Sequence, residues 1–123
     1  MQDMKEVTNR WLARNAKGKG LVACGVLYSD QTTVNHTASP QFPVEALDNT
    51  WNCLANAFQF LRQNQNDGEQ MRWVFENFFL HGAIRGDNAC LGIFTSKSEE
   101  EYDPIVVNRM ISEFKGILIS EKR

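Results

Sequence analysis

The sequence of 123 residues has few cysteines and no long apolar run, and both shortages exclude classes of protein. Cys24, Cys53 and Cys90 are odd in number and widely spaced in apolar surroundings, which indicates reduced core thiols rather than a disulfide framework. The N-terminal segment mixes acids, bases and apolar residues, unlike a signal peptide. No apolar run approaches the roughly 20 residues that cross a bilayer. We therefore expect a cytoplasmic protein with no membrane partner.

An excess of charge of one sign is also lacking. The 13 basic and 15 acidic side chains nearly balance, whereas a nucleic-acid-binding domain usually carries a basic stripe. A basic cluster within residues 5–19 is diluted by acids and is typical of a solvated helix face. We therefore expect no nucleic-acid partner.

Catalytic motifs are the third absence. The sequence has no phosphate-binding glycine loop and no HExxH, GxSxG or CxxC motif. His36 or His81 could join a cysteine as base and nucleophile, but the apolar surroundings of the cysteines favour inert thiols. The spacing of these residues places no pair of metal ligands on one helical turn or hairpin. We expect no catalytic residue, no metal and no cofactor, so the protein is not expected to be an enzyme.

The tripeptide Arg85-Gly86-Asp87 would suggest cell adhesion in a secreted protein. Apolar and β-branched runs flank it on both sides, and they predict a β-hairpin whose turn is exposed to solvent. In that turn Gly86 tolerates a positive φ, and Asp87 and Asn88 can bond their own backbone. Because no export signal precedes it, the tripeptide is interpreted as turn chemistry.

Apolar periodicity and turn residues together predict the order of the elements. Helices are expected at 3–15, at 43–63 and from 104 onward, and strands at 21–29, 33–39, 71–76, 78–85 and 89–96. Asp103 and Pro104 are typical of a helix start, and the acids at 99–101 suit the positive end of its dipole. The order α-β-β-α-β-β-β-α predicts an α+β fold, with a five-stranded antiparallel sheet sandwiched by helices.

The long helix at 43–63 has more apolar surface than one sheet would cover. At about 100° per residue, two adjacent apolar arcs form. The arc of large residues comprises Leu47, Trp51, Leu54, Phe58 and Leu61, and the second arc comprises Ala46, Cys53, Ala57 and Phe60. The large arc suits the sheet. The second arc suits close approach of another helix, for example from a second copy of the chain, and the alternative is that loops of the same chain cover it.

The order of elements resembles the roadblock/dynein light chain domain, whose fold is related to profilin. The likeness rests on the hairpin GLVACGVLYSDQTTVNHTAS, the apolar central helix and the closing strand ACLGIFTS. It implies one domain over 1–123, with an N-terminal helix and connection at 1–19 and a core at 20–121. The chain departs from the family at Asp30-Gln31-Thr32, where a glycine is common.

The resemblance implies a non-catalytic adaptor or regulator that dimerises and binds a small Ras-like GTPase or a motor complex. The third strands of two copies would pair, with their long helices side by side. The implied dimer interface comprises Ala46, Thr50, Cys53, Ala57, Phe60, Arg72, Trp73, Val74 and Phe75. A candidate partner surface comprises Glu45, Asp48, Asn49, Asn52 and Asn56.

A small-molecule sensor is the alternative function. Folds of this kind hold ligands between a sheet and its long helix. The aromatic residues that could line such a pocket are Trp51, Phe58, Trp73, Phe75, Phe78 and Phe79.

Overall fold

The computed structural model describes residues 4–18, 20–37, 39–64, 69–97 and 103–121, and the side chains up to residue 117. The elements are α1 (Met4–Asn15), β1 (Leu21–Leu27), β2 (Thr33–Thr37), α2 (Val44–Gln63), β3 (Gln70–Val74), β4 (Phe78–Ile84), β5 (Cys90–Ser96) and α3 (Pro104–Glu121). The five strands form one antiparallel sheet in the order β2-β1-β5-β4-β3. The predicted fold class and element order are therefore confirmed.

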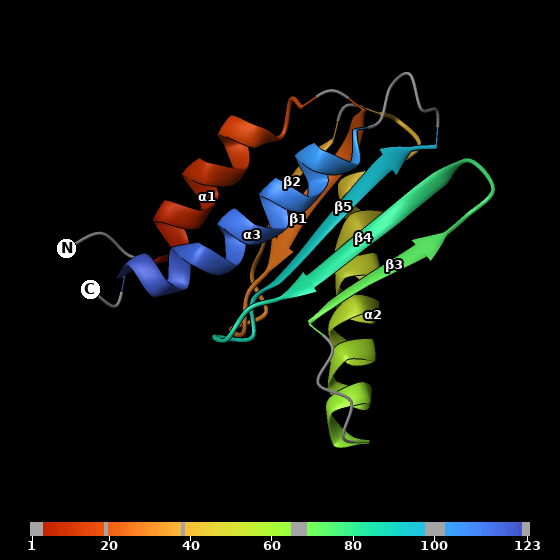
Figure 1. The fold of residues 1–123 in the computed structure, drawn as a ribbon. Coiled ribbons are helices and arrows are strands. Elements are labelled where there is room, and N and C mark those ends of the chain that lie inside the picture. Colours follow the sequence, from red (N-terminus) through yellow and green to blue (C-terminus); the bar gives the residue numbers. More distant parts are fainter. Residues whose placement is uncertain (1–3, 19, 38, 65–68, 98–102, 122–123) are drawn as a thin grey trace.

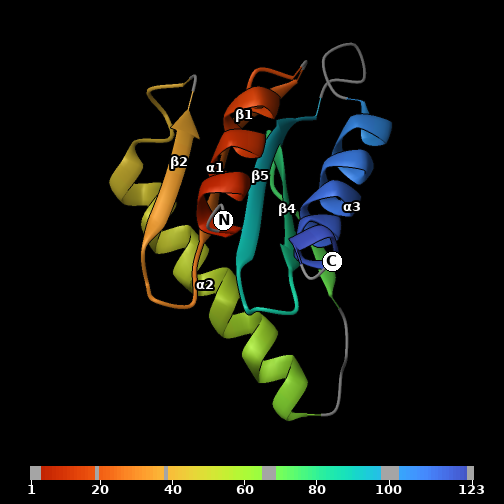
Figure 2. The ribbon, with the colours of Figure 1, turned by 90° about the vertical axis from the view of Figure 1, so that its left-hand side faces the viewer.

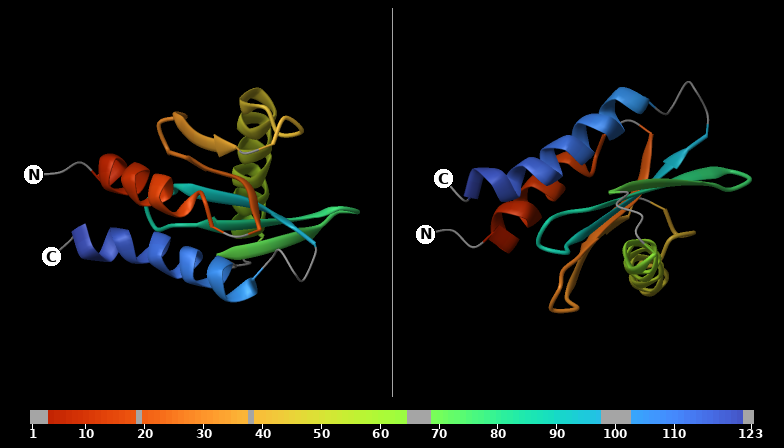
Figure 3. Two further views of the ribbon diagram at one scale, coloured as in Figure 1. Left: turned by 90° about the horizontal axis from the view of Figure 1, so that it is seen from above. Right: turned by 60° about the horizontal axis from the view of Figure 1, so that its bottom comes forward.

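The helices cover both faces of the sheet. Helices α1 and α3 lie side by side on one face, and α2 crosses the other (Figures 1 and 3). The C-terminal turns of α2 project past the end of the sheet (Figure 2). No helix among the described residues has the length and apolar character that crossing a bilayer requires.

Two separate apolar cores result. The core under α1 and α3 contains Trp11, Leu12, Met110 and Phe114 with β-strand residues such as Val26, Leu91 and Ile93. The core under α2 contains four of the five residues of the large-residue arc, with Leu47, Trp51, Leu54 and Phe58 buried against the sheet, whereas Leu61 is partly exposed. The packing predicted for these four residues is therefore confirmed.

A row of three glycines runs across the centre of the sheet. Gly25 on β1 pairs with Gly92 on β5, and Gly92 pairs with Gly82 on β4. The indole of Trp51 lies against this row, since a Cβ on Gly92 would fall 2.1 Å from Trp51 Cζ3 and a Cβ on Gly25 2.3 Å from Trp51 Nε1. Only a strand without side chains at these positions leaves room for the ring. The Trp51 Nε1 donates a hydrogen bond to Asn35 Oδ1 on β2, which fixes the indole.

The start of α3 matches its sequence signal. Asp103 Oδ1 accepts a hydrogen bond from Ile105 N at 2.9 Å, and Pro104 is the first helical residue. This is the geometry of an N-cap, so that prediction is confirmed. The acids at 99–101 lie outside the described residues.

Two of the three hairpin turns place a residue other than glycine in the left-handed region. Gln31 has a φ of 72°, and the carboxylate of neighbouring Asp30 accepts bonds from the N and Oγ1 of Thr32. The β4–β5 turn has Asn88 at a φ of 68°. Gly86 does not use its tolerance of a positive φ: Asn88, which also tolerates this conformation, occupies the left-handed position of the turn.

The expected solvent exposure of the β4–β5 turn is wrong for its first residue. Arg85 is 1% exposed, and its guanidinium bonds both carboxylate oxygens of Asp87 at 2.9 Å. It also donates to Thr8 Oγ1 on α1 at 3.0 Å and to the Phe114 carbonyl on α3 at 3.3 Å. The guanidinium carbon lies 4.5 Å from the centre of the Phe114 ring. The Arg85 side chain thus turns inward and joins the turn to both helices.

Candidate functional site

Strand β3 forms one free edge of the sheet. The Phe75 N donates to the Phe78 carbonyl and the Ile84 N to the Glu69 carbonyl, both at 2.9 Å. Because antiparallel pairs alternate, the odd-numbered residues of β3 bond β4 and the even-numbered ones point their N–H and C=O groups outward. Gln70, Arg72 and Val74 therefore present the open backbone groups of this edge.

The side chains of this edge and of its following turn include large exposed apolar groups. Val74 is 60% exposed and Phe75 is 47% exposed. Trp73 is half-buried and packs against the core under α2. An edge strand with an apolar surface and no protecting proline or lysine is a ready site for pairing with another chain.

The second apolar arc of α2 is also uncovered. Ala46 and Cys53 are exposed, Ala57 is partly exposed, and Phe60, near the projecting end, is 64% exposed. The expectation that all three cysteines are core thiols is therefore wrong for Cys53, because the helix turns that position away from the sheet. Loops of the same chain do not cover this arc among the described residues.

Two apolar hollows lie beside α2, one between it and β3 and the other along the β3–β4 turn. One of about 340 Å³ is lined by Thr50, Cys53, Ala57, Trp73 and Phe75, together with Leu54 and Leu80. The next, of about 430 Å³, lies along Phe75 to Phe78 and extends to Phe42 and Phe94. The structure therefore brings residues of the long helix and of the third strand, which the sequence assigned to one interface, onto one continuous surface. Ala46 and Phe60 extend it along α2, and Arg72 and Val74 extend it along the strand edge.

The polar residues proposed as a partner surface form a stripe on α2. Glu45, Asn49 and Asn56 are exposed or partly exposed, and Asn52 is exposed with its amide bonded to the Asp48 carbonyl. Asp48 differs, because its carboxylate accepts bonds from Thr33 Oγ1 at 2.8 Å and Asn35 Nδ2 at 2.7 Å. Asp48 therefore attaches α2 to β2, which the sequence analysis did not foresee.

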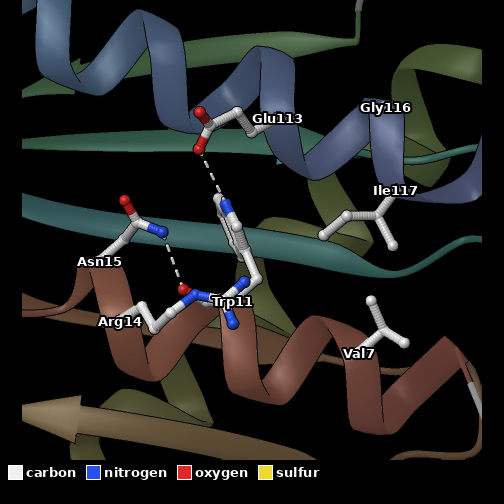
Figure 4. A pocket seen from close by; sticks show the side chains of 7 residues that line it. All are labelled: Val7, Trp11, Arg14, Asn15, Glu113, Gly116 and Ile117. Atoms are coloured by element: carbon white, nitrogen blue, oxygen red, sulfur yellow. Dashed lines mark hydrogen bonds between the residues drawn. The ribbon is translucent and has the colours of Figure 1, made fainter. Parts of the chain in front are cut away.

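A groove of about 670 Å³ lies on the opposite face, between α1 and α3. Figure 4 shows Trp11 spanning it, with its Nε1 donating to Glu113 Oε1 at 3.0 Å. Arg14 stands on one wall and Val7 and Ile117 at one end (Figure 4). The lining mixes apolar groups with both signs of charge, so it favours no single class of ligand.

One pair of the cysteines and histidines weighed for catalysis is brought together, because Cys24 on β1 lies directly opposite His36 on β2. Burial raises the pKa of the thiols of Cys24 and Cys90 to about 12, so both stay protonated at neutral pH. His81 is buried, and its Nε2 lies 3.0 Å from Thr95 Oγ1. Desolvation, with the charge of Arg72 as a smaller cause, lowers the pKa of His81 to about 4. The described residues contain no cluster of three potential metal ligands among His, Cys, Asp and Glu.

Comparison with known proteins identifies the fold through solved structures and not through the sequence. No family model and no curated protein matches the sequence. Solved structures do match: gliding protein MglB from Thermus thermophilus has 14% identity and a TM-score of 0.65, over 95% of this chain and 92% of its own. An MglB with a tetrameric arrangement has 16% identity and a TM-score of 0.66, over 95% and 91%.

A named domain shares the same architecture. The Roadblock/LC7 domain from Streptomyces avermitilis has 14% identity and a TM-score of 0.62, over 92% of this chain and 95% of its own. Identities this low establish the fold and leave the activity to the residues themselves. The chain has a roadblock-type fold.

Proposed function

We propose that the protein is a non-catalytic homodimeric adaptor of the cytoplasm that regulates or scaffolds a small Ras-like GTPase. The observation that carries the proposal is the continuous apolar surface formed by the β3 edge and the second arc of α2. Removing apolar surface from water is worth about 25 cal/mol per Å², and a twofold axis brings the same surface of two copies together. The sheet would then continue from one copy into the next.

Charge and side-chain size favour one register for the paired β3 strands. With Val74 opposite the partner copy's own Val74, Trp73 faces Phe75 of the second copy on the α2 side. On the other side Arg72 comes opposite Glu76 of the second copy, which is an attractive cross-strand pair. A register with Arg72 on the axis would instead place two guanidinium groups opposite each other. Val74 is therefore proposed at the axis, with Ala57 near it on α2.

The polar stripe of α2 supports a separate partner surface. Glu45, Asn49, Asn52 and Asn56 lie beside the proposed dimer arc, and none of them is buried. Two copies would present two such stripes across one composite face. We assign this face to the GTPase or to a motor or signalling complex, and higher assembly such as a tetramer would use surfaces left open by the dimer.

Matched variants separate dimerisation from partner binding. Ala57→Arg and Val74→Arg should each yield monomer in light scattering, because each places like charges near the axis. Asn56→Arg, on the stripe, should leave the dimer intact and abolish capture of Ras-like GTPases from a purified panel. A wild-type monomer at micromolar concentration, or an unchanged Ala57→Arg dimer, would refute the interface. Capture of no GTPase by a wild-type dimer would refute the partner.

A small-molecule sensor is the second candidate, favoured by the two hollows beside α2. Their walls are mostly aromatic and aliphatic, and they include Trp73, Phe75 and Phe78. A ligand held there would raise the melting temperature in proportion to the logarithm of its concentration. A dimer that covers the hollows would give no such shift with any apolar compound.

A further inference from the structure

Strand β2 forms the second free edge of the sheet, on the side away from β3. The Tyr28 N donates to the Thr32 carbonyl at 2.9 Å, so the even-numbered residues of β2 bond β1. By the same alternation Thr33, Asn35 and Thr37 direct their N–H and C=O groups away from the sheet. The strand contains no proline and no lysine, the residues that usually protect an edge.

The two faces of β2 differ beside this edge. The side chains of Thr33 and Asn35 lie on the α2 face, where Asp48 holds them. Val34 packs into the core under α1 and α3, and His36, two residues on, lies on that same face. An added strand would therefore meet polar groups on one face and an apolar residue followed by His36 on the other.

A hollow of about 220 Å³ adjoins His36. Its walls are the end of α1, with Ala13, Ala16 and Lys17, and the end of β2, with His36 and Thr37. The two alanines leave space that a larger side chain would fill. Among the described residues no carboxylate forms an ion pair with Lys17 or His36.

We propose that the β2 edge binds an extended segment of another protein, which adds a sixth strand and places an Asp or Glu in this hollow beside Lys17 and His36. The outward N–H and C=O groups of β2 would form the hydrogen bonds to the added strand, and the hollow would select segments with an acidic side chain at the matching position. The peptide residue two positions from the acid would lie beside Val34 and is therefore expected to be apolar. Residues between these positions face the polar side of β2, so apolar and polar residues should alternate along the peptide. Pairing with the β2 strand of a second copy does not fit, because the segment TVNHT contains no carboxylate.

This site is independent of the proposed dimer. Strands β2 and β3 are at opposite edges of the sheet (Figure 1), so one can be occupied without the other. The failure of either proposal leaves the other standing, since the two use different strands and different helices.

The probe is a displayed library of random ten-residue peptides, selected on the immobilised full chain. Enriched peptides should alternate apolar and polar residues around one Asp or Glu. The most enriched peptide is then synthesised, and its Kd is measured by fluorescence polarisation. Exchange of its acid for Gln or Asn should weaken binding about tenfold, because a charge-assisted contact is lost.

Two variants of the chain locate the peptide. Thr37→Pro removes an outward N–H while leaving the bonds to β1, and it should weaken binding about tenfold. Lys17→Glu should weaken it similarly, and a peptide with Lys in place of its acid should restore binding to this variant. Arg109→Glu, a charge reversal on α3, is the matched control and should bind as the wild type does. Lys17 follows the last turn of α1 and lies outside both apolar cores, so this variant tests the site even where Thr37→Pro fails to fold.

Amide hydrogen exchange gives a direct readout. The amides of Thr33, Asn35 and Thr37 should gain protection when the peptide binds, whereas those of Val34 and His36 are already protected by β1. The proposal is overturned if no peptide is enriched, if the enriched peptides lack an acid, or if binding survives Lys17→Glu with these three amides still unprotected.

Discussion

The two faces of the sheet are closed to different degrees. On one face α1 and α3 lie side by side, and Arg85 joins both helices to the β4–β5 turn. On the other face α2 lies alone and leaves Phe60 and Phe75 exposed at its side. The first face is complete within one chain, while the second ends in apolar surface. The apolar surface for self-association is therefore to be sought on the α2 face, and the predictions below test this difference.

The largest effect is expected where α2 lies closest to the sheet. Gly92→Val places a branched side chain where Trp51 Cζ3 already lies 2.1 Å from the position of a Cβ. We expect a loss of more than about 4 kcal/mol in the free energy of unfolding, measured by urea denaturation. Gly116→Ala on α3 meets nothing within 4 Å and should stabilise by about 0.5–1 kcal/mol. Equal effects of the two changes would contradict the close packing of Trp51.

The next effect concerns the closed face. Arg85→Met keeps the length of the side chain but removes its bonds to Thr8, the Phe114 carbonyl and Asp87. We expect a loss of about 2–3 kcal/mol, the usual cost of leaving buried polar groups unpaired. Arg62→Met, which removes an exposed bond from the end of α2 to Asn88, should cost less than about 0.5 kcal/mol. If Arg85→Met lowered the free energy of unfolding as little as Arg62→Met does, the packing of α1 and α3 would not depend on the hydrogen bonds of Arg85.

Acid should weaken the fold through His81. Its pKa falls from 6.5 to about 4 on folding, so the unfolded chain binds the proton more readily in this interval. The stability it contributes is present above pH 6.5 and is lost as the pH falls towards 4, at no more than about 1.4 kcal/mol per unit. His81→Gln can still reach Thr95 and should flatten this slope between about pH 6.5 and 4.5. An unchanged slope would assign the acid sensitivity to other groups.

The smallest effect distinguishes the thiols. Cys24 and Cys90, one in each core, should resist a thiol reagent under native conditions, whereas exposed Cys53 should react within seconds to minutes. In the proposed dimer Cys53 lies near the axis and should react several-fold more slowly than in Ala57→Arg. Equal rates would place Cys53 outside the interface.

Local signals in the sequence were sufficient for the order of the elements and for the buried arc of α2. Turn residues, the N-cap at Asp103 and helical periodicity act over a few positions, so they can be read without the fold. Arg85 could not be placed in this way, because its partner Thr8 is distant in the chain and its sequence context is an ordinary turn. The inward direction of a charged side chain depends on which helices cover the sheet.

Only those parts of the candidate site that depend on local sequence signals could be predicted. Periodicity identified the uncovered arc of α2, and the resemblance supplied the strand that lies beside it. Asp48 looked like any polar residue on a helix surface, although it holds β2 through Thr33 and Asn35. The hollow beside His36 required the end of α1 and the end of β2 in one place, and no local pattern reports that proximity.

The glycine row beneath Trp51 also constrains how this sequence can change over evolutionary time. A side chain at Gly92 or Gly25 is harmful while the indole is present, and a smaller residue at position 51 leaves an empty trough while the glycines are present. Each single step is unfavourable, yet a smaller residue at 51 followed by alanine at 92 would refill the space. The order of substitutions therefore matters, and we expect Trp51 and the glycines beneath it either to be substituted together or to remain unchanged.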